Sequence, residues 1–123
     1  MKIFTGCDIV RISRFSDLLS DTHFLDRCFT RAEQEYCFAK ANPAQHFAAR
    51  FAGKEAVLKA LSGIDVRYFI GNLEIVVAES GRPSMVFHGN AVSQEQLPPD
   101  LTADISLSHD GEYAMATAVV YIP

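Results

Sequence analysis

The stretch NPAQHFAARFAGKEAVLKAL, residues 42–61, decides the fold because it predicts the longest helix of the chain. The side chain of Asn42 suits the N-cap position, and Pro43 suits the first helical residue, where no backbone N–H is needed. Ser62-Gly63 follows directly and is typical of a helix stop. We therefore expect a helix that begins at Pro43 and ends near Leu61.

Two stripes of side chains run along this predicted helix. The first is apolar and should face the core; it consists of Phe47, Phe51, Leu58 and Leu61. The second is turned about 100° from the first and is formed by Ala48, Ala52, Glu55 and Lys59. Small residues let another group approach, and a carboxylate and an ammonium follow one turn apart. An ordinary surface ion pair has the same spacing, and helix geometry alone favours that simpler interpretation. Arg50 and Lys54 add positive charge to the helix, which would attract anions.

The remaining pattern predicts one strand, several helices and then four strands, which favours an α+β fold over a parallel α/β sheet. Strands are expected at 2–10, 73–78, 85–87, 104–109 and 112–122, and further helices at 13–19, 31–39 and 90–97. Ser13 is the expected N-cap of the first of these helices. Thr30 and Glu33 form a capping box at the second. Asp110-Gly111 predicts a two-residue hairpin loop.

Length and charge limit the class of protein. The 123 residues suit a single domain, residues 1–123, that buries a core without staples. Residues 1–67 hold ten bases and eight acids, a net charge of +2, whereas residues 68–123 hold one base and seven acids, a net charge of −6. This balance argues against a nucleic-acid binder. Before any motif is considered, an ordinary solvated surface is the favoured explanation of the uneven charges.

Cysteines and hydropathy indicate the compartment. Cys7, Cys28 and Cys37 form no zinc pattern, and each is expected to be a small buried hydrophobe rather than a catalytic thiol. The N-terminus has no signal-peptide pattern, and no stretch approaches the roughly 18 apolar residues of a membrane helix. We expect a cytoplasmic protein with reduced thiols and no membrane partner.

Asp8 and His109 stand out within apolar strand patterns. A lone acid such as Asp8 is costly in a strand unless it is paired, hydrated or bound to a metal. It either caps a turn at the strand end or ligates a hard cation such as Mg²⁺, with Glu55 as the second carboxylate if the fold brings the two together. His109 ends its strand on the apolar side, and a half-buried histidine held by the hairpin is at least as well supported as a functional one.

Several segments together resemble the holo-[acyl-carrier-protein] synthase family, the small stand-alone type of 4′-phosphopantetheinyl transferase. The segments are GCDIV at 6–10, FLDRCFT at 24–30, RFAGKEAVLKAL at 50–61, GRP at 81–83, SLSH at 106–109 and EYAMA at 112–116. The resemblance runs in order from Gly6 to about Val120. It implies an α+β fold of the phosphopantetheinyl transferase superfamily, with an antiparallel sheet packed against a long helix, in a homotrimer with active sites between subunits.

The resemblance also implies a reaction and a set of site residues. The family transfers 4′-phosphopantetheine from coenzyme A to a serine hydroxyl of apo acyl carrier protein, a carrier of fatty-acid or polyketide type, and releases adenosine 3′,5′-bisphosphate. By position, Asp8 and Glu55 match the Mg²⁺ ligands, and Lys59 matches a lysine near the pyrophosphate. Arg50 and His109 match residues that hold the coenzyme A phosphates, and Arg14 matches a carrier contact. Such a transfer depends on positioning and charge neutralisation, with Glu55, or a water that it orients, as the candidate base.

Two positions depart from the family pattern, and two other functions stay open. Arg11 stands where the family usually has an acid, and residues 62–68 hold less glycine than usual.

The alternative functions are a non-catalytic module that binds a carrier protein or coenzyme A, and an oligomeric structural protein. Coenzyme A and acyl carrier protein are both acidic, so the resemblance predicts that the uneven charges form a local basic surface on an otherwise acidic protein. The bases expected to form it are Arg11, Arg14, Arg27, Arg50, Lys54 and Lys59.

Overall fold

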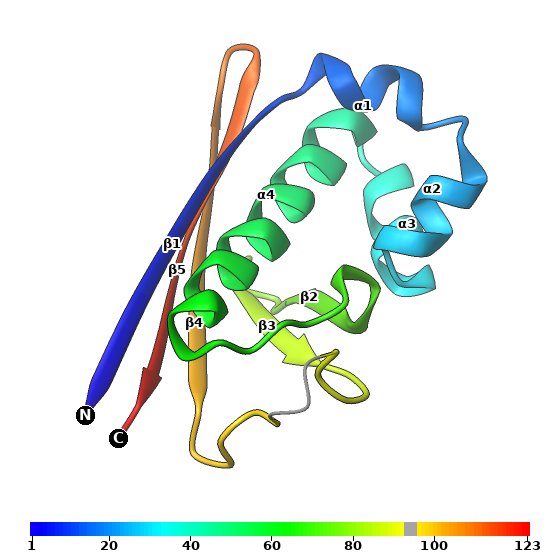
Figure 1. The fold of residues 1–123 in the computed structure, drawn as a ribbon. Coiled ribbons are helices and arrows are strands. Elements are labelled where there is room, and N and C mark those ends of the chain that lie inside the picture. The colour runs from blue at the N-terminus through cyan, green and yellow to red at the C-terminus, as the bar shows by residue number, and fades with distance from the viewer. Residues whose placement is uncertain (93–95) are drawn as a thin grey trace.

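The computed structural model describes residues 1–92 and 96–123 and has an α+β architecture (Figure 1). Its elements are β1 (Lys2–Arg11), α1 (Ser13–Leu18), α2 (Thr22–Cys28), α3 (Arg31–Phe38), α4 (Pro43–Leu61), the 3₁₀ turns η1 (Ser62–Ile64) and η2 (Ile70–Asn72), β2 (Leu73–Val77), β3 (Pro83–Phe87), β4 (Thr102–Asp110) and β5 (Tyr113–Ile122). This order of one strand, several helices and four strands confirms the predicted α+β class.

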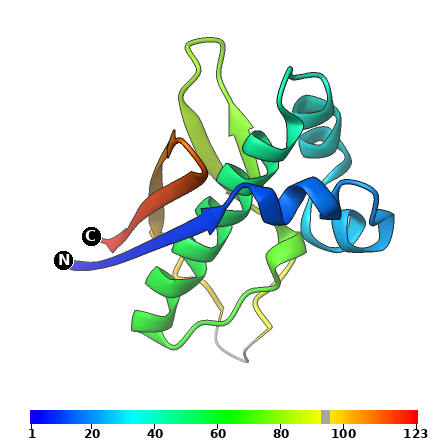
Figure 2. The same ribbon diagram turned by 90° about the horizontal axis from the view of Figure 1, so that it is seen from above.

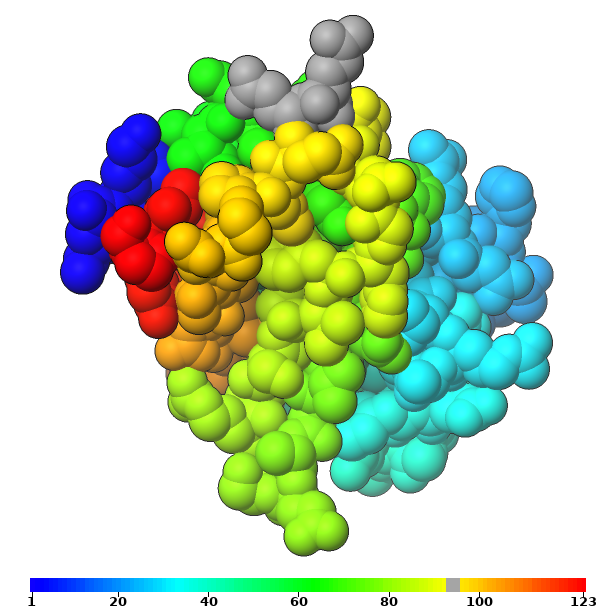
Figure 3. All heavy atoms as spheres, turned by 90° about the horizontal axis from the view of Figure 1, so that it is seen from below, coloured from blue at the N-terminus to red at the C-terminus, as the bar shows by residue number. Residues whose placement is uncertain are grey.

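The strands form two antiparallel sheets. The larger sheet has the order β1-β5-β4, so β1 and β4 are its edges, and β2 pairs only with β3. In the view from above, the β2–β3 hairpin stands apart from the larger sheet, with α4 between them and the N-terminal helices (Figure 2). Seen from below, the ends of β1, β5 and β4 lie side by side, and the hairpin lies between them and the region of α2 and α3 (Figure 3).

Helix α4 packs against the inner face of the larger sheet because small residues line the contact. Ala114, Ala116 and Ala118 of β5 are buried there, as are Ala56 and Ala60 of α4. The predicted apolar stripe is only part of the buried surface: Phe47 and Leu61 are fully buried, whereas Phe51 and Leu58 are half-buried. Since the sheet, the β2–β3 hairpin and the N-terminal helices all surround α4, more than one of its faces is buried.

The outer face of the larger sheet is uncovered (Figure 1). Side chains alternate along β1 and β5, and every second one points away from α4. The large apolar residues exposed on this face are Ile3, Ile9, Tyr113, Met115 and Val119. A row of exposed apolar side chains of this kind is typical of an interaction surface.

Two of the predicted helix caps are confirmed. The Thr30 side chain accepts a hydrogen bond from the backbone N–H of Glu33, and the Glu33 carboxylate accepts one from the N–H of Thr30. Asn42 accepts from the N–H of Gln45, with Pro43 as the first residue of α4. Both signals are local in sequence, which is why the sequence alone predicts them.

Three local predictions are wrong. Ile12, not Ser13, precedes α1, because the Ile12 N–H pairs with the carbonyl of Glu112 and the chain turns directly from β1 into the helix. After α4 the chain continues into η1, and the left-handed residue that ends it is Asp65, with φ 58°, rather than Gly63. The hairpin loop consists of residues 111 and 112, since Asp110 still pairs with Tyr113.

Two further differences concern whole helices. Helix α2 is not predicted from the sequence; the Asp21 side chain caps it by accepting from the N–H of Phe24. The helix expected at 90–97 falls partly on residues 93–95, which lie outside the described residues; residues 90–92 and 96–97 are not helical. Within the described parts of the chain, every helix is too short or too polar to span a bilayer.

Candidate active site

The site begins where β1 and α4 approach most closely. A Cβ atom on Gly6 would overlap the backbone carbonyl of Ala56, so only glycine permits this approach. Asp8 lies two residues further along the strand and therefore points to the same side, toward α4. The glycine thus brings the carboxylate of Asp8 against the helix that carries Glu55 and Lys59.

Lys59 joins this strand to the helix. Its Nζ donates to the carbonyl oxygen of Cys7 at 2.9 Å and to Oδ1 of Asp8 at 3.1 Å. The Lys59 side chain is 54% exposed and that of Asp8 only 19%, so the ion pair is open to solvent on the lysine side. Lys59 therefore pairs with Asp8, not with Glu55 as a simple surface pair along the helix would require. Asp8 is also not a strand-end cap, because it lies inside β1.

Glu55 completes a cluster of two carboxylates and two cations. Burial raises the pKa of Glu55, and the nearby Asp8 carboxylate raises it further. Lys59 and Arg14 offset part of this pKa shift, so Asp8, Lys59 and Arg14 all lie within electrostatic reach of Glu55. Two carboxylates that repel each other in a half-buried place suit a hard divalent cation, which typically takes one or two of them. The described residues contain no cluster of three or more His, Cys, Asp or Glu side chains that could hold a metal.

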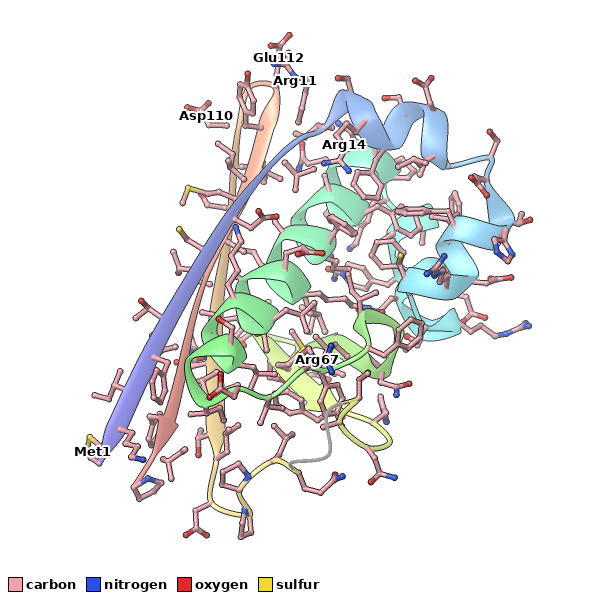
Figure 4. The ribbon with its side chains drawn as sticks, viewed as in Figure 1. Met1, Arg11, Arg14, Arg67, Asp110 and Glu112 are labelled. Carbon is pink, nitrogen blue, oxygen red and sulfur yellow. The ribbon has the colours of Figure 1, made fainter. Side chains whose placement is uncertain are left out.

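Arg14 lies on the α1 side of this cluster. Its guanidinium carbon is 5.8 Å from the ring centroid of Phe51, a residue of α4. Figure 4 shows Arg14 on α1 beside α4, and it shows Arg11, Asp110 and Glu112 together at the end of the sheet where β1 enters α1. Arg14 is exposed, so it is available to a partner, whereas the guanidinium of Arg11 lies 5.3 Å from the ring centroid of Tyr113.

Arg50 forms a second site. The residue is only 3% exposed, and its guanidinium carbon lies 4.2 Å from the ring centroid of Tyr36. Its one hydrogen bond is long, from Nη1 to the carbonyl oxygen of His46 at 3.4 Å, and its buried Nε has no partner among the described residues. No carboxylate of the described residues lies within ion-pair distance of it. A buried cation without a counter-charge is costly, which favours binding of an anion here.

His109 shares a cavity with Arg50. The cavity has a volume of about 170 Å³, and its walls include Tyr36, His46, Arg50, Pro83 and His109. Nε2 of Gln45 donates to Nε2 of His109 at 3.0 Å, so this ring nitrogen of His109 is the acceptor of the hydrogen bond. His109 is exposed in the single chain rather than half-buried. The structure therefore brings together the two residues that were matched to phosphate binding.

The two sites lie on different sides of α4. Arg50 and Glu55 are five residues apart, which places their side chains about 140° apart around a helix. Asp8 belongs to edge strand β1, whereas His109 belongs to the opposite edge, β4. One copy of the chain thus holds a carboxylate–lysine site and a separate cationic cavity.

The predicted basic surface is smaller than expected. Lys54 is completely buried, where its Nζ donates to Oε1 of Glu33 at 2.6 Å and to the carbonyl oxygen of Cys28 at 2.7 Å. Burial lowers the pKa of Lys54, and Glu33 offsets part of that pKa shift. Lys54 and the buried Arg50 therefore do not contribute to a solvated basic surface, contrary to the expectation from their sequence positions.

Tyr36 and His46 are not among the predicted site residues. Both line the cavity with Arg50 and His109, and their rings are 6.1 Å apart. His46 precedes Arg50 by four residues on α4, so helical spacing could have paired them. Nothing in the sequence indicates that Tyr36 meets them, because α3 and α4 approach only in the folded chain.

Comparison with known proteins gives consistent matches. Residues 5–118 match the family described as the 4′-phosphopantetheinyl transferase superfamily. A holo-[acyl-carrier-protein] synthase of Syntrophotalea carbinolica is 44% identical over 118 residues, which cover 93% of this chain and 91% of the relative. The structure of Mycobacterium tuberculosis acyl carrier protein synthase is 31% identical with a TM-score of 0.74, and the match covers 99% of this chain and 100% of that chain. Helicobacter pylori holo-[acyl-carrier-protein] synthase, in complex with coenzyme A, is 26% identical with a TM-score of 0.70, covering 95% and 99%.

Proposed function

The chain belongs to the 4′-phosphopantetheinyl transferase superfamily, and on this premise we propose that it acts as a holo-[acyl-carrier-protein] synthase. It would transfer 4′-phosphopantetheine from coenzyme A to a serine hydroxyl of apo acyl carrier protein. The serine oxygen forms a bond to the phosphorus that carries pantetheine, the pyrophosphate bond breaks, and adenosine 3′,5′-bisphosphate leaves. The observation that carries this proposal is the cluster of Asp8, Glu55 and Lys59 at the contact between β1 and α4.

Each residue of the cluster has a role in such a transfer. Asp8 and Glu55 would hold Mg²⁺, which neutralises charge on the pyrophosphate. Lys59 is exposed enough to turn its ammonium from Asp8 toward a phosphate oxygen and to stabilise the leaving bisphosphate. Glu55, or a water that it orients, is the candidate acceptor of the serine proton.

The cationic cavity would hold phosphates of coenzyme A. Arg50 is buried without a counter-charge, and the cavity of about 170 Å³ that it lines also includes His109. A phosphate group there would give the guanidinium the hydrogen-bond acceptors that the protein does not supply. Arg14, exposed on α1 at the edge of the carboxylate cluster, is the candidate contact for the acidic carrier protein.

We further propose a homotrimer in which the two sites of neighbouring subunits meet. One protomer has the carboxylate cluster and the cationic cavity on different sides of α4, at opposite edges of the sheet. The uncovered apolar sheet face supplies a surface for association. Three free cysteines suit a reducing compartment such as the cytoplasm.

The test is a mass-shift assay. Apo acyl carrier protein, coenzyme A and Mg²⁺ should yield a carrier heavier by one phosphopantetheine group, as measured by mass spectrometry. Asp8→Ala and Glu55→Ala should abolish the mass gain while the fold survives. Glu79→Ala, which removes an exposed acid from the turn between β2 and β3, is the matched control and should keep full activity. Binding of coenzyme A without any mass gain on several carriers would instead support a non-catalytic binding module.

A further inference from the structure

Three basic side chains contact the ring of Tyr36. Nζ of Lys40 lies 4.5 Å from the ring centroid, the guanidinium carbon of Arg50 lies 4.2 Å from it, and the ring of His46 packs edge-on at 6.1 Å. Tyr36 also lines both cavities beside Arg50, of about 170 and 190 Å³. It therefore forms part of the wall between them.

The basic groups around this ring are not neutralised by the protein. Neither Lys40 nor Arg50 forms an ion pair with any described residue. Burial lowers the pKa of His46, and the charges of Arg50, Lys40 and His109 lower it further, as expected where cationic groups face one another. The two acids that line the cavity of about 190 Å³ with Arg50 already have partners, since Glu33 pairs with Lys54 and Glu74 pairs with His88.

Two contacts hold the Arg50 guanidinium: the face of the Tyr36 ring and one long hydrogen bond. The long bond from Nη1 to His46 is the single hydrogen bond of the guanidinium within the described chain. The face of an aromatic ring attracts a guanidinium and aligns it by stacking. The Tyr36 hydroxyl has no hydrogen bond within the described chain, so the ring and not the hydroxyl makes the contact.

We propose that Tyr36 is a positioning residue for the substrate's phosphate groups: its ring holds the Arg50 guanidinium so that unpartnered N–H groups face an anion in the cavity shared with His109. This inference rests on the proposed function, because coenzyme A supplies the phosphates. Tyr36 itself touches no reacting atom. The carboxylate cluster lies on the other side of α4, so loss of Tyr36 acts on binding and not on the chemical step.

The experiment compares Tyr36→Leu with Tyr36→Phe. Leucine removes the ring face, so the KM for coenzyme A and the Kd for adenosine 3′,5′-bisphosphate should rise on the order of tenfold, the range expected for loss of a partly desolvated cation–π contact. The kcat should stay unchanged. Phenylalanine keeps the ring face and should restore both constants to near wild-type values. Phe38→Leu, which removes another ring from α3, is the matched control and should leave both constants unchanged.

A double variant separates positioning from general damage. If Tyr36 acts through Arg50, then Tyr36→Leu should weaken bisphosphate binding no further in an Arg50→Ala background. Tyr36→Met fills the volume without a ring face and replaces the leucine variant if that variant does not fold.

Three outcomes would overturn the inference: wild-type affinity in both the leucine and methionine variants, equal losses in the leucine and phenylalanine variants, or additive losses with Arg50→Ala. Isothermal titration with the bisphosphate needs no turnover. It therefore tests Tyr36 even if the transferase assay is negative, and failure of the proposed function remains distinguishable from failure of this inference.

Discussion

Two of the three cysteines, Cys28 and Cys37, are buried, whereas Cys7 is exposed. Burial of Cys28 and Cys37 confirms the prediction made for the cysteines, and exposure of Cys7 contradicts it. Burial raises the pKa of Cys37 to about 11, and it raises the pKa of Cys28, an effect that Lys54 and Arg27 partly offset. The thiolate is the nucleophile, and a thiol with a pKa of about 11 is ionised to about one part in a thousand at pH 8. In a Cys7→Ser variant, iodoacetamide at pH 8 should therefore leave native protein unmodified and should label both remaining thiols in urea. Mass spectrometry measures the labelling, and modification of Cys37 in folded protein would contradict the expectation.

At the scale of single residues, the sequence predicts which side chains form the site better than it predicts which residues each of them contacts. Asp8, Glu55 and Lys59 were identified, and the fold brings them together. Lys54, the direct neighbour of Glu55, was expected on the surface but is buried against Glu33. Its partner lies on another helix, so no local spacing indicates the pair. The stack of Tyr36 on Arg50 was missed for the same reason.

Among the elements, β1 depends on Gly6 for its approach to α4. In Gly6→Ala the new methyl group would overlap the carbonyl of Ala56 and push the strand away from the helix. We expect a loss of about 1–3 kcal/mol in the free energy of unfolding. Displacement of Asp8 from Lys59 should also reduce turnover on the order of 100-fold. Thermal unfolding and the mass-shift assay measure the two effects.

A second glycine provides the control for this variant. Gly111 has φ 59° in the hairpin loop, and nothing lies within 4 Å of the position that a Cβ would take. Asparagine tolerates that conformation, so Gly111→Asn should remain close to wild type in both measurements. If Gly6→Ala kept wild-type turnover, the close approach would not be what positions Asp8.

The pair of Lys54 and Glu33 ties α4 to α3 and β2. The Glu33 carboxylate accepts from Lys54, from the N–H of Thr30 and from the N–H of Ile75. Lys54→Met would leave a buried carboxylate without its counter-charge, and we expect a loss of about 3–5 kcal/mol in the free energy of unfolding. The double variant Glu33→Gln with Lys54→Met removes both charges and should recover much of that loss. Urea unfolding measures it, and additive losses would show that the two residues are not coupled.

Elements were predictable from sequence where their signals are local. The capping box of Thr30 and Glu33 and the cap at Asn42 lie within four residues and were correct. The split of the strands into two sheets was not predicted, because strand pairing depends on contacts between distant segments. Gly63 is predicted as a helix stop, but in the structure it lies against Phe4, and a Cβ there would overlap the ring unless the ring moved.

For the whole molecule, the attraction of an acidic carrier depends more on where the charges lie than on the net charge. The net charge is −4, and α1 carries one base, Arg14, and one acid, Asp17. Binding of an acidic carrier should still weaken as salt rises, because exposed charges are screened. Since Arg50 and Lys54 are buried, we expect this salt dependence to come from the expected bases that stay exposed, which are Arg11, Arg14, Arg27 and Lys59.

Titration of carrier binding at several salt concentrations tests this. Arg14→Ala should reduce both the affinity and its dependence on salt. Lys2→Ala removes an exposed base at the other end of β1 and should change neither the affinity nor its salt dependence. Carrier affinity that is independent of salt in the wild type would contradict the role of a basic surface.

The arrangement of the two sites predicts complementation between inactive chains. Glu55→Ala destroys the carboxylate cluster and keeps the cationic cavity. Arg50→Ala destroys the cationic cavity and keeps the carboxylate cluster. If each active site joins the cluster of one subunit to the cavity of its neighbour, a mixed trimer contains some sites with two intact halves. Random mixing of equal amounts in a closed ring gives about one site in four of this kind. After joint unfolding and refolding, the mixture should recover about a quarter of wild-type turnover when coenzyme A is too dilute to fill the cavity of Arg50→Ala. Each variant refolded alone should show little turnover under the same conditions. A mixture that forms trimers but shows no turnover would mean that both halves must come from one chain.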